Sequence, residues 1–316
     1  MKVFYNPAYT AAAHASDTTR KSGEIATAMA EGCAPGCDVV DPIDFVDLAE
    51  ELIEATHAPA YVEALRTGEP YDLAGSQGFN WDEGIWVMAV NSTAGVLAAV
   101  DEALAAGRSS GSLSSGLHHA RRAGGAGYCT VNGLAMAATR ATDLVSGTVV
   151  ILDLDAHCGG GTNELIGGDE RILHLDLSTS SFDSYSPDGD DELTVLHGPT
   201  DIEYLKHVQR CLGRIPEDTG LVIYNAGMDP HPTVSTEGLA QREHLVAGWC
   251  ARHAVPAAFV LAGGYTWGIT MVELVDLHLQ TVRAFAGRPS PPAREPSVTH
   301  QNNNGIEVGN SPIRNG

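Results

Sequence analysis

Short apolar runs rich in β-branched residues alternate along the chain with longer, alanine-rich stretches. Runs without a polar face are typical of strands that are buried on both sides. We predict strands at 2–5, 37–40, 148–155, 171–177, 221–227 and 257–264. The apolar spacing predicts helices at 84–107, 132–145 and 201–215. This alternation predicts an α/β fold with a parallel sheet covered on both faces.

The pattern ends near Arg288, where Pro, Asn, Gly and Ser replace the periodic apolar residues. Such a composition cannot bury enough apolar surface to fold. We therefore predict a folded domain over 1–287 and a disordered tail over 288–316.

The chain is acidic: its 316 residues include 18 basic and 40 acidic ones, a net charge of −22. This charge predicts no nucleic-acid binding, because affinity for nucleic acids depends on neutralising phosphates. It favours cationic partners only weakly, since acidic surfaces often serve solubility. The N-terminus lacks a secretory pattern, and no apolar run reaches the roughly 18 residues of a membrane span. We expect a cytoplasmic protein that does not bind membranes, with its six cysteines in a reducing compartment.

Polar and titratable residues follow several of the predicted strands. In open parallel sheets, ligands bind beyond the carboxyl ends of the strands. Two histidines also stand in the segment before the helix at 132–145. The side chains that would meet at this edge are Asp155, His157, Asp229, Tyr265, His118 and His119.

The stretch "ILDLDAHCGGGT" (151–162) carries the pattern D-x-D-x-H. In an extended segment Asp155 and His157 point to the same side, so both can reach one ion. With Asp229 they would form a set of two carboxylates and one imidazole, which leaves open positions on Zn²⁺. Asp153 could orient a histidine or bind a monovalent ion, and an accidental cluster is the alternative. The glycines do not form a phosphate loop, because no Lys follows them.

The tandem pair His118–His119 strengthens the catalytic interpretation. Beside a metal, one imidazole can take a proton from water while the other, aided by a carboxylate, donates or protects one.

Taken together, the motifs resemble the histone deacetylase and acetylpolyamine amidohydrolase superfamily. The matching segments are "HAPAYVEALRTG" (57–68), "GLHHARRAGGAGYCTVNGLAMAA" (116–138), "VVILDLDAHCGGGT" (149–162), "YNAGMDPH" (224–231) and "LAGGYTW" (261–267). The resemblance implies the arginase-deacetylase fold, a three-layer αβα arrangement with a mostly parallel sheet. The Ala- and Gly-rich composition predicts a bacterial source.

The resemblance also implies a role for each matching residue. Zinc would be bound by Asp155, His157 and Asp229, and potassium by Asp153 and Asp176. His118 would pair with Asp153, His119 would act as general base and then acid, and Tyr265 would bind the carbonyl oxygen. The remaining implied positions are Gly127 and Tyr128, which would line an acyl-lysine tunnel, and Gly263 and Gly264, which would let Tyr265 move.

The chain departs from the family's pattern at four places. Cys158 and Gly160 stand where relatives have His and Asp or Asn. Losing the latter side chain leaves His119 without its usual brace. Either a water or another side chain substitutes for it, or the pKa of His119 is lower and the pH optimum is shifted. For the second tunnel wall we predict Tyr185 or Ser186. The segment 72–84 is too short for the dimerising insertion of acetylpolyamine hydrolases, so we expect a monomer or weak homo-oligomer.

We therefore expect a zinc-dependent deacetylase acting on an acetylated amine such as acetyl-lysine, an acetylpolyamine or a small-molecule intermediate. A non-catalytic or weakly active binding protein is one alternative, motivated by Gly160. A two-manganese ureohydrolase is the other, disfavoured because Gly159 stands where that chemistry needs a carboxylate.

Overall fold

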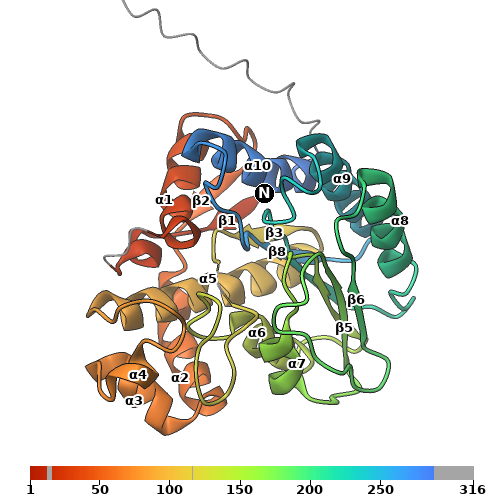
Figure 1. Cartoon of the computed structure of the whole chain (residues 1–316). Coiled ribbons are helices and arrows are strands. Elements are labelled where there is room, and N and C mark those ends of the chain that lie inside the picture. Colours follow the sequence, from red (N-terminus) through yellow and green to blue (C-terminus); the bar gives the residue numbers. More distant parts are fainter. Residues whose placement is uncertain (13–15, 116, 288–316) are drawn as a thin grey trace, which may run out of the picture.

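The computed structural model describes residues 1–12, 16–115 and 117–287. The predicted tail, 288–316, lies outside the described residues. Within them, eight strands form one sheet in the order β2-β1-β3-β8-β7-β4-β5-β6, and every neighbouring pair is parallel (Figure 1). The predicted α/β fold with a parallel sheet is confirmed. The strands are β1 (Lys2–Phe4), β2 (Asp38–Val40), β3 (Ser110–Ser112), β4 (Val149–Asp153), β5 (Ile172–Ser178), β6 (Glu192–Val195), β7 (Leu221–Asn225) and β8 (Ala257–Val260).

Helices cover both faces of the sheet, which gives three layers (Figure 1). One face carries α2 (Val46–Thr56), α3 (Pro59–Thr67), α5 (Gly84–Ala106), α6 (Gly133–Ala141) and α7 (Gly160–Ile166). The other face carries α1 (Asp17–Ala30), α8 (Asp201–Leu212), α9 (Thr236–His253) and α10 (Met271–Phe285). The remaining short elements are η1 (Pro7–Thr10), η2 (Ile43–Phe45) and α4 (Tyr71–Ala74).

A hydrophobic core lies on each face of the sheet, and the side chains of a strand point alternately into one core and the other. In β4, Val149 and Ile151 belong to the core under α5 and α6, whereas Val150 and Leu152 belong to the core under α8 and α9. Because both sets are apolar, the strand reads as a continuous apolar run rather than an alternating one. This explains why apolar runs alone located six of the eight strands.

Helix α5 is long and apolar enough, by length and composition only, to cross a membrane. However, 72% of its most apolar stretch is buried inside the protein, as in the core helix of a folded domain. The sequence-based statement that no run reaches this length is therefore too strict. No other helix in the described part of the chain meets the same criteria.

The sheet brings the ends of β4, β7 and β8 together at one edge. β7 lies between β4 and β8, and Asp153 pairs in register with Asn225 on one side and Asp176 on the other. The loops that follow these strands therefore start side by side. This places Asp155, Asp229 and Gly263 at one site.

Candidate active site

Asp155, His157 and Asp229 converge at this edge of the sheet. Each offers one ligand atom, and these atoms lie within 4.8 Å of one another. The amide of His157 donates to Asp155 Oδ1 at 3.0 Å, and the amide of Ala156 donates to Asp229 Oδ1 at 3.0 Å. Asp229 Oδ2 is buried and lies 3.0 Å from His157 Nδ1, in a geometry that does not form a regular hydrogen bond. The backbone thus fixes the two carboxylates and leaves an acceptor directed to a shared point.

The charges of these three side chains indicate a cation site. Burial and the charge of Asp155 raise the pKa of Asp229. Burial alone would lower the pKa of His157, but Asp155 and Asp229 raise it to about 11. Two buried carboxylates and one imidazole match the donors of a catalytic zinc site, which keeps open positions. The residues present therefore fit a divalent metal ion.

Glycines leave the space that this site needs. A Cβ atom at Gly263 would lie 2.5 Å from Asp229 Cγ and 2.7 Å from Asp155 Oδ2, and Gly263 has φ +50°. A side chain at position 263 would therefore displace a carboxylate and strain the backbone.

His118 forms a buried pair with Asp153. Its Nδ1 lies 2.8 Å from Asp153 Oδ2, and Asp153 Oδ1 accepts hydrogen bonds from Asn225 Nδ2 at 2.8 Å and the Asp155 amide at 3.1 Å. Burial alone would lower the pKa of His118, but the charges of Asp153 and Asp155 raise it to about 10. The two carboxylates therefore favour the protonated form of His118.

His119 has a carboxylate partner that the sequence did not predict. Its Nδ1 lies 2.9 Å from Oδ2 of Asp183, in the segment between β5 and β6. Burial and the charge of His118 lower the pKa of His119 to about 4, although Asp183 acts in the opposite direction. The two adjacent imidazoles therefore hold different protonation states at neutral pH, a typical division between acid and base.

The same segment corrects the prediction for the second tunnel wall. Phe182, rather than Tyr185, contacts the site: its ring centroid lies 5.0 Å from that of His119 and 5.8 Å from that of His157. Tyr185 turns inward, with its hydroxyl 3.2 Å from both Asp176 Oδ2 and His174 Nδ1. The register of a loop with two aromatic residues cannot be read from spacing alone.

Aromatic rings also flank the opposite side of the site. The ring of Tyr128 stacks on that of Phe79, with 5.3 Å between the ring centroids, and its centroid lies 6.3 Å from that of Tyr265. The ring of Tyr265 in turn stacks on that of Trp267, with 4.6 Å between the centroids. Burial and the charge of Asp229 raise the pKa of Tyr265, so its hydroxyl stays protonated. Gly127 lies against His119: a Cβ there would come within 2.3 Å of His119 Cδ2.

Helix α1 holds the segment around Tyr265 on both sides. Asp17 Oδ2 accepts hydrogen bonds from the amide and hydroxyl of Thr266, at 2.8 and 2.6 Å. One turn further along α1, buried Lys21 donates through Nζ to the carbonyl of Gly263. Burial lowers the pKa of Lys21 to about 7. Neither residue is predicted from the sequence, because α1 carries no motif that marks them.

Arg242 of α9 links the two segments that carry the acidic ligands. The Arg242 side chain is fully buried, and its Nη1 donates to the carbonyls of Leu154 at 3.0 Å and Gly227 at 2.7 Å. Its charge is balanced by Glu243, whose Oε1 lies 2.6 Å from Arg242 Nη2. The backbones next to Asp155 and Asp229 are thus tied to one side chain.

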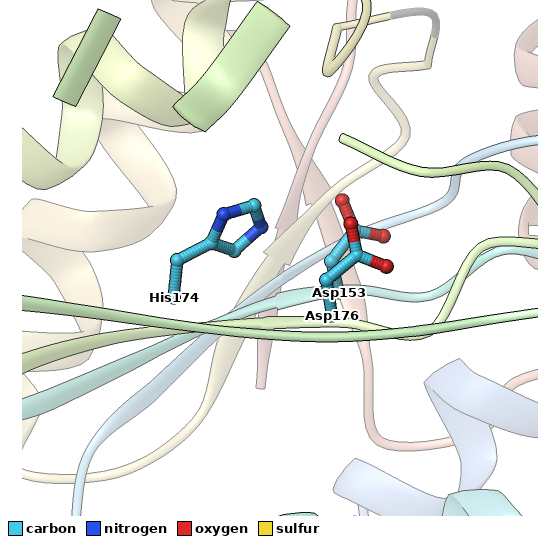
Figure 2. A group of neighbouring side chains, drawn as sticks. All are labelled: Asp153, His174 and Asp176. Carbon is cyan, nitrogen blue, oxygen red and sulfur yellow. The ribbon is translucent and has the colours of Figure 1, made fainter. Parts of the chain in front are cut away.

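A second group able to hold a cation lies beneath the first. Asp153, His174 and Asp176 each offer a ligand atom within 4.8 Å of the others, and Figure 2 shows the two carboxylates side by side near the His174 ring. Asp176 already accepts hydrogen bonds from the Gly159 amide, at 2.7 Å, and the Ser178 hydroxyl, at 2.6 Å. Potassium binding at Asp153 and Asp176 stays a prediction.

Comparisons with known proteins identify the family of the chain. Residues 14–282 match the sequence profile of the histone deacetylase domain. An uncharacterized protein of Picosynechococcus sp. is 30% identical over 247 residues, which cover 73% of this chain and 80% of that protein. Histone deacetylase 2 of Arabidopsis thaliana is 28% identical over 167 residues, 48% of this chain and 43% of the relative. Acetylpolyamine amidohydrolase of Burkholderia pseudomallei is 25% identical over 170 residues, 47% of this chain and 48% of the relative. The chain thus spans less than half of the last two relatives.

Solved structures share the fold. Acetylpolyamine aminohydrolase from Burkholderia pseudomallei superposes with a TM-score of 0.70 at 18% identity, covering 91% of this chain and 98% of that one. The HD domain of HDA15 gives a TM-score of 0.71 at 17% identity, covering 91% of each chain. At such low identities the likeness establishes the three-layer fold alone.

Proposed function

This chain belongs to the histone deacetylase domain family, and from that premise we propose that it is a zinc-dependent deacetylase that removes the acetyl group from an acetylated amine. One observation carries the proposal: the ligand atoms of Asp155, His157 and Asp229 lie within 4.8 Å of one another. His119 and Tyr265 adjoin this group, and they supply the base and the hydroxyl donor that amide hydrolysis needs.

Zinc, held by Asp155, His157 and Asp229, would supply positive charge that polarises the acetyl carbonyl and acidifies water. The protein residues then carry the proton. Because His119 is neutral at pH 7, its Nε2 accepts a proton from the attacking water and returns it to the leaving nitrogen. A C–O bond forms and the C–N bond breaks, which gives acetate and a free amine.

Two further side chains stabilise the charge that develops on the carbonyl oxygen. Tyr265 keeps its proton because its pKa is raised, so its hydroxyl donates a hydrogen bond to that oxygen. His118 keeps a positive charge through its pair with Asp153, which adds to the field at the site. Gly127 keeps the edge of His119 accessible, since a Cβ there would contact that ring.

The substrate in this proposal is a linear acetylated amine, such as acetyl-lysine, an acetylpolyamine or a small-molecule intermediate. Tyr128 and Phe182 would flank its acyl chain, supported by their contacts with Tyr265 and His119. The net charge of −22 favours a substrate with a cationic amine. A bacterial source, a cytoplasmic location and a monomer or weak homo-oligomer stay predictions.

Acetate release tests the proposal. The zinc-loaded chain is assayed with an acetyl-lysine peptide, an N-acetylated diamine and an uncharged N-acetylated amine. We expect turnover of at least one substrate. Replacing Tyr265 by Phe should lower kcat by about 10²–10³-fold, the usual effect of removing one oxyanion donor. Tyr71→Phe, which changes an exposed tyrosine, serves as the matched control.

The alternatives predict other outcomes of the same measurements. A chain that binds one zinc ion but releases no acetate from any substrate would be a binding protein. Two bound manganese ions, with urea formed from a guanidino substrate, would identify a ureohydrolase. The carboxylate partner of His119 removes the reason that motivated the binding protein, because the brace missing at Gly160 is supplied from elsewhere.

A further inference from the structure

We propose that Asp183 is the positioning residue of His119 and that Gly160 is its necessary counterpart, because glycine leaves the space that the loop of Asp183 occupies. This inference rests on the proposed function, because it explains how His119 is held as a competent base.

The hydrogen bonds around His119 define its orientation. A carboxylate can only accept, so the contact of 2.9 Å between His119 Nδ1 and Asp183 Oδ2 places the proton on Nδ1. Nε2 is then left with its lone pair available. Arg121 binds the other oxygen, Asp183 Oδ1, and also donates to Glu164 Oε2 at 2.9 Å. Asp183 is thus fixed from both sides.

Space explains why position 160 is glycine. A Cβ atom at Gly160 would lie 2.5 Å from the carbonyl oxygen of Asp183, 2.6 Å from its Oδ1 and 2.7 Å from Arg121 Nη2. Real Cβ contacts are not that short, so the loop holding Asp183 would have to move. A side chain at position 160 and the observed position of Asp183 therefore exclude each other.

The loop that carries Asp183 is attached to the metal-binding segment. The amides of Thr179 and Ser180 both donate to the carbonyl of Ala156, at 2.9 and 2.8 Å, and the amide of Cys158 donates to the carbonyl of Phe182 at 3.0 Å. These bonds bring the loop to His157 and set its register. They explain why Phe182 and Asp183 both face the site.

Asp183 adopts an unusual backbone conformation to make this contact. Its φ is +60°, in the left-handed region that disfavours most side chains, although Asp and Asn tolerate it best. Such strain persists where the surrounding contacts enforce it, and it is frequent at functional sites. In this conformation Asp183 forms its hydrogen bond with His119.

The test compares two variants that tolerate this φ. Asp183→Gly removes the acceptor, whereas Asp183→Asn keeps an oxygen that can accept from Nδ1. We expect Asp183→Gly to lower kcat about 10–100-fold with little change in KM, and Asp183→Asn to lose only a few-fold. Asp188→Gly and Asp188→Asn, at an exposed position on the same segment, are the matched controls.

A second readout does not depend on turnover. In ¹⁵N-histidine NMR spectra of the substrate-free protein, His119 should be the Nδ1-protonated tautomer in wild type and Asp183→Asn, and a mixture of tautomers in Asp183→Gly. Gly160→Asp should reduce activity.

The outcomes separate this inference from the proposed function. If no substrate is turned over but the tautomer changes in Asp183→Gly, the positioning role stands and the deacetylase proposal fails. Wild-type kcat and an unchanged His119 tautomer in Asp183→Gly would overturn the positioning role. So would a Gly160→Asp variant with wild-type activity and an intact contact between His119 and Asp183.

Discussion

Thr266 donates two hydrogen bonds to a single oxygen of Asp17, one from its amide at 2.8 Å and one from its hydroxyl at 2.6 Å. Thr266 directly follows Tyr265, so this pair ties the proposed hydroxyl donor to helix α1. Hydrogen bonds to a charged group contribute about 1.5–3 kcal/mol. We expect Asp17→Ala to lower kcat several-fold, because Tyr265 loses its fixed position.

The measurement is a comparison of kcat and KM with those of Asp47→Ala. Asp47 stands in the first turn of α2 as Asp17 does in α1, but it is exposed and its helix packs on the other face of the sheet. An equal loss of activity in both variants would show that removing an acidic residue from the first turn of a helix lowers kcat, and that the contact with Thr266 is not the cause.

The activity should persist well into the acid range. Burial and His118 lower the pKa of His119 to about 4, and the base works only when unprotonated. Activity is therefore present above this pKa and is lost as pH falls through it. A bound divalent cation acts in the same direction, because it also disfavours protonation. The profile of kcat/KM against pH, with bound zinc verified at each point, should show no acidic limb near 6.5, the ordinary histidine value.

Removing Arg242 should destabilise the whole domain. Arg242→Met leaves Glu243 buried without its partner and two carbonyls without their donor. Breaking a buried ion pair in this way costs about 3–5 kcal/mol, which urea unfolding should reveal. The double variant Arg242→Met/Glu243→Leu should recover part of the loss. Arg252→Met, at an exposed position on the same helix, should unfold like wild type.

Metal removal should lower the melting temperature. A ligand that binds only the folded state at 100 times its Kd stabilises by about 2.7 kcal/mol. We expect chelation to lower Tm, zinc to restore it, and Asp229→Asn to abolish the effect because it removes the charge of one proposed ligand. Asp72→Asn, an exposed acid in the first turn of α4, should respond as wild type does. A zinc response retained in Asp229→Asn would contradict the assigned site.

Trp267 should distinguish cationic from neutral substrates. It is 76% exposed and stacks on Tyr265, so its free face can meet a substrate beyond the acetyl group. A cation over an exposed indole gains about 0.5–1 kcal/mol. Trp267→Ala should therefore raise KM a few-fold for an acetylated diamine and leave KM for an uncharged acetylated amine unchanged. Equal effects on both substrates would exclude a role in charge recognition.

The fold was accessible from the sequence because apolar runs mark most of the strands. The predicted reason for the closeness of Asp155 and His157, the alternation of an extended strand, is wrong, because β4 ends at Asp153 and residues 155–157 form a bend; the loop after the strand brings their ligand atoms together. Strand β3, "SGS", was missed because small residues carry no apolar pattern; it exists through its pairing with β1 and β8.

The partners of the catalytic residues were not accessible, since they depend on contacts distant in sequence. Asp183 lies 64 residues from His119, in a loop whose register is set by bonds to Ala156 and Cys158. No local pattern encodes that register, which is why the wall residue was predicted wrongly.

The exclusion between Gly160 and Asp183 has a consequence for recombination with relatives. A donor segment with any side chain at position 160 would meet the backbone of Asp183 if only the segment after His157 were exchanged. A donor segment without a carboxylate at position 183 would leave His119 without its present partner if only the segment after β5 were exchanged. The two loops should therefore be exchanged together, as one unit.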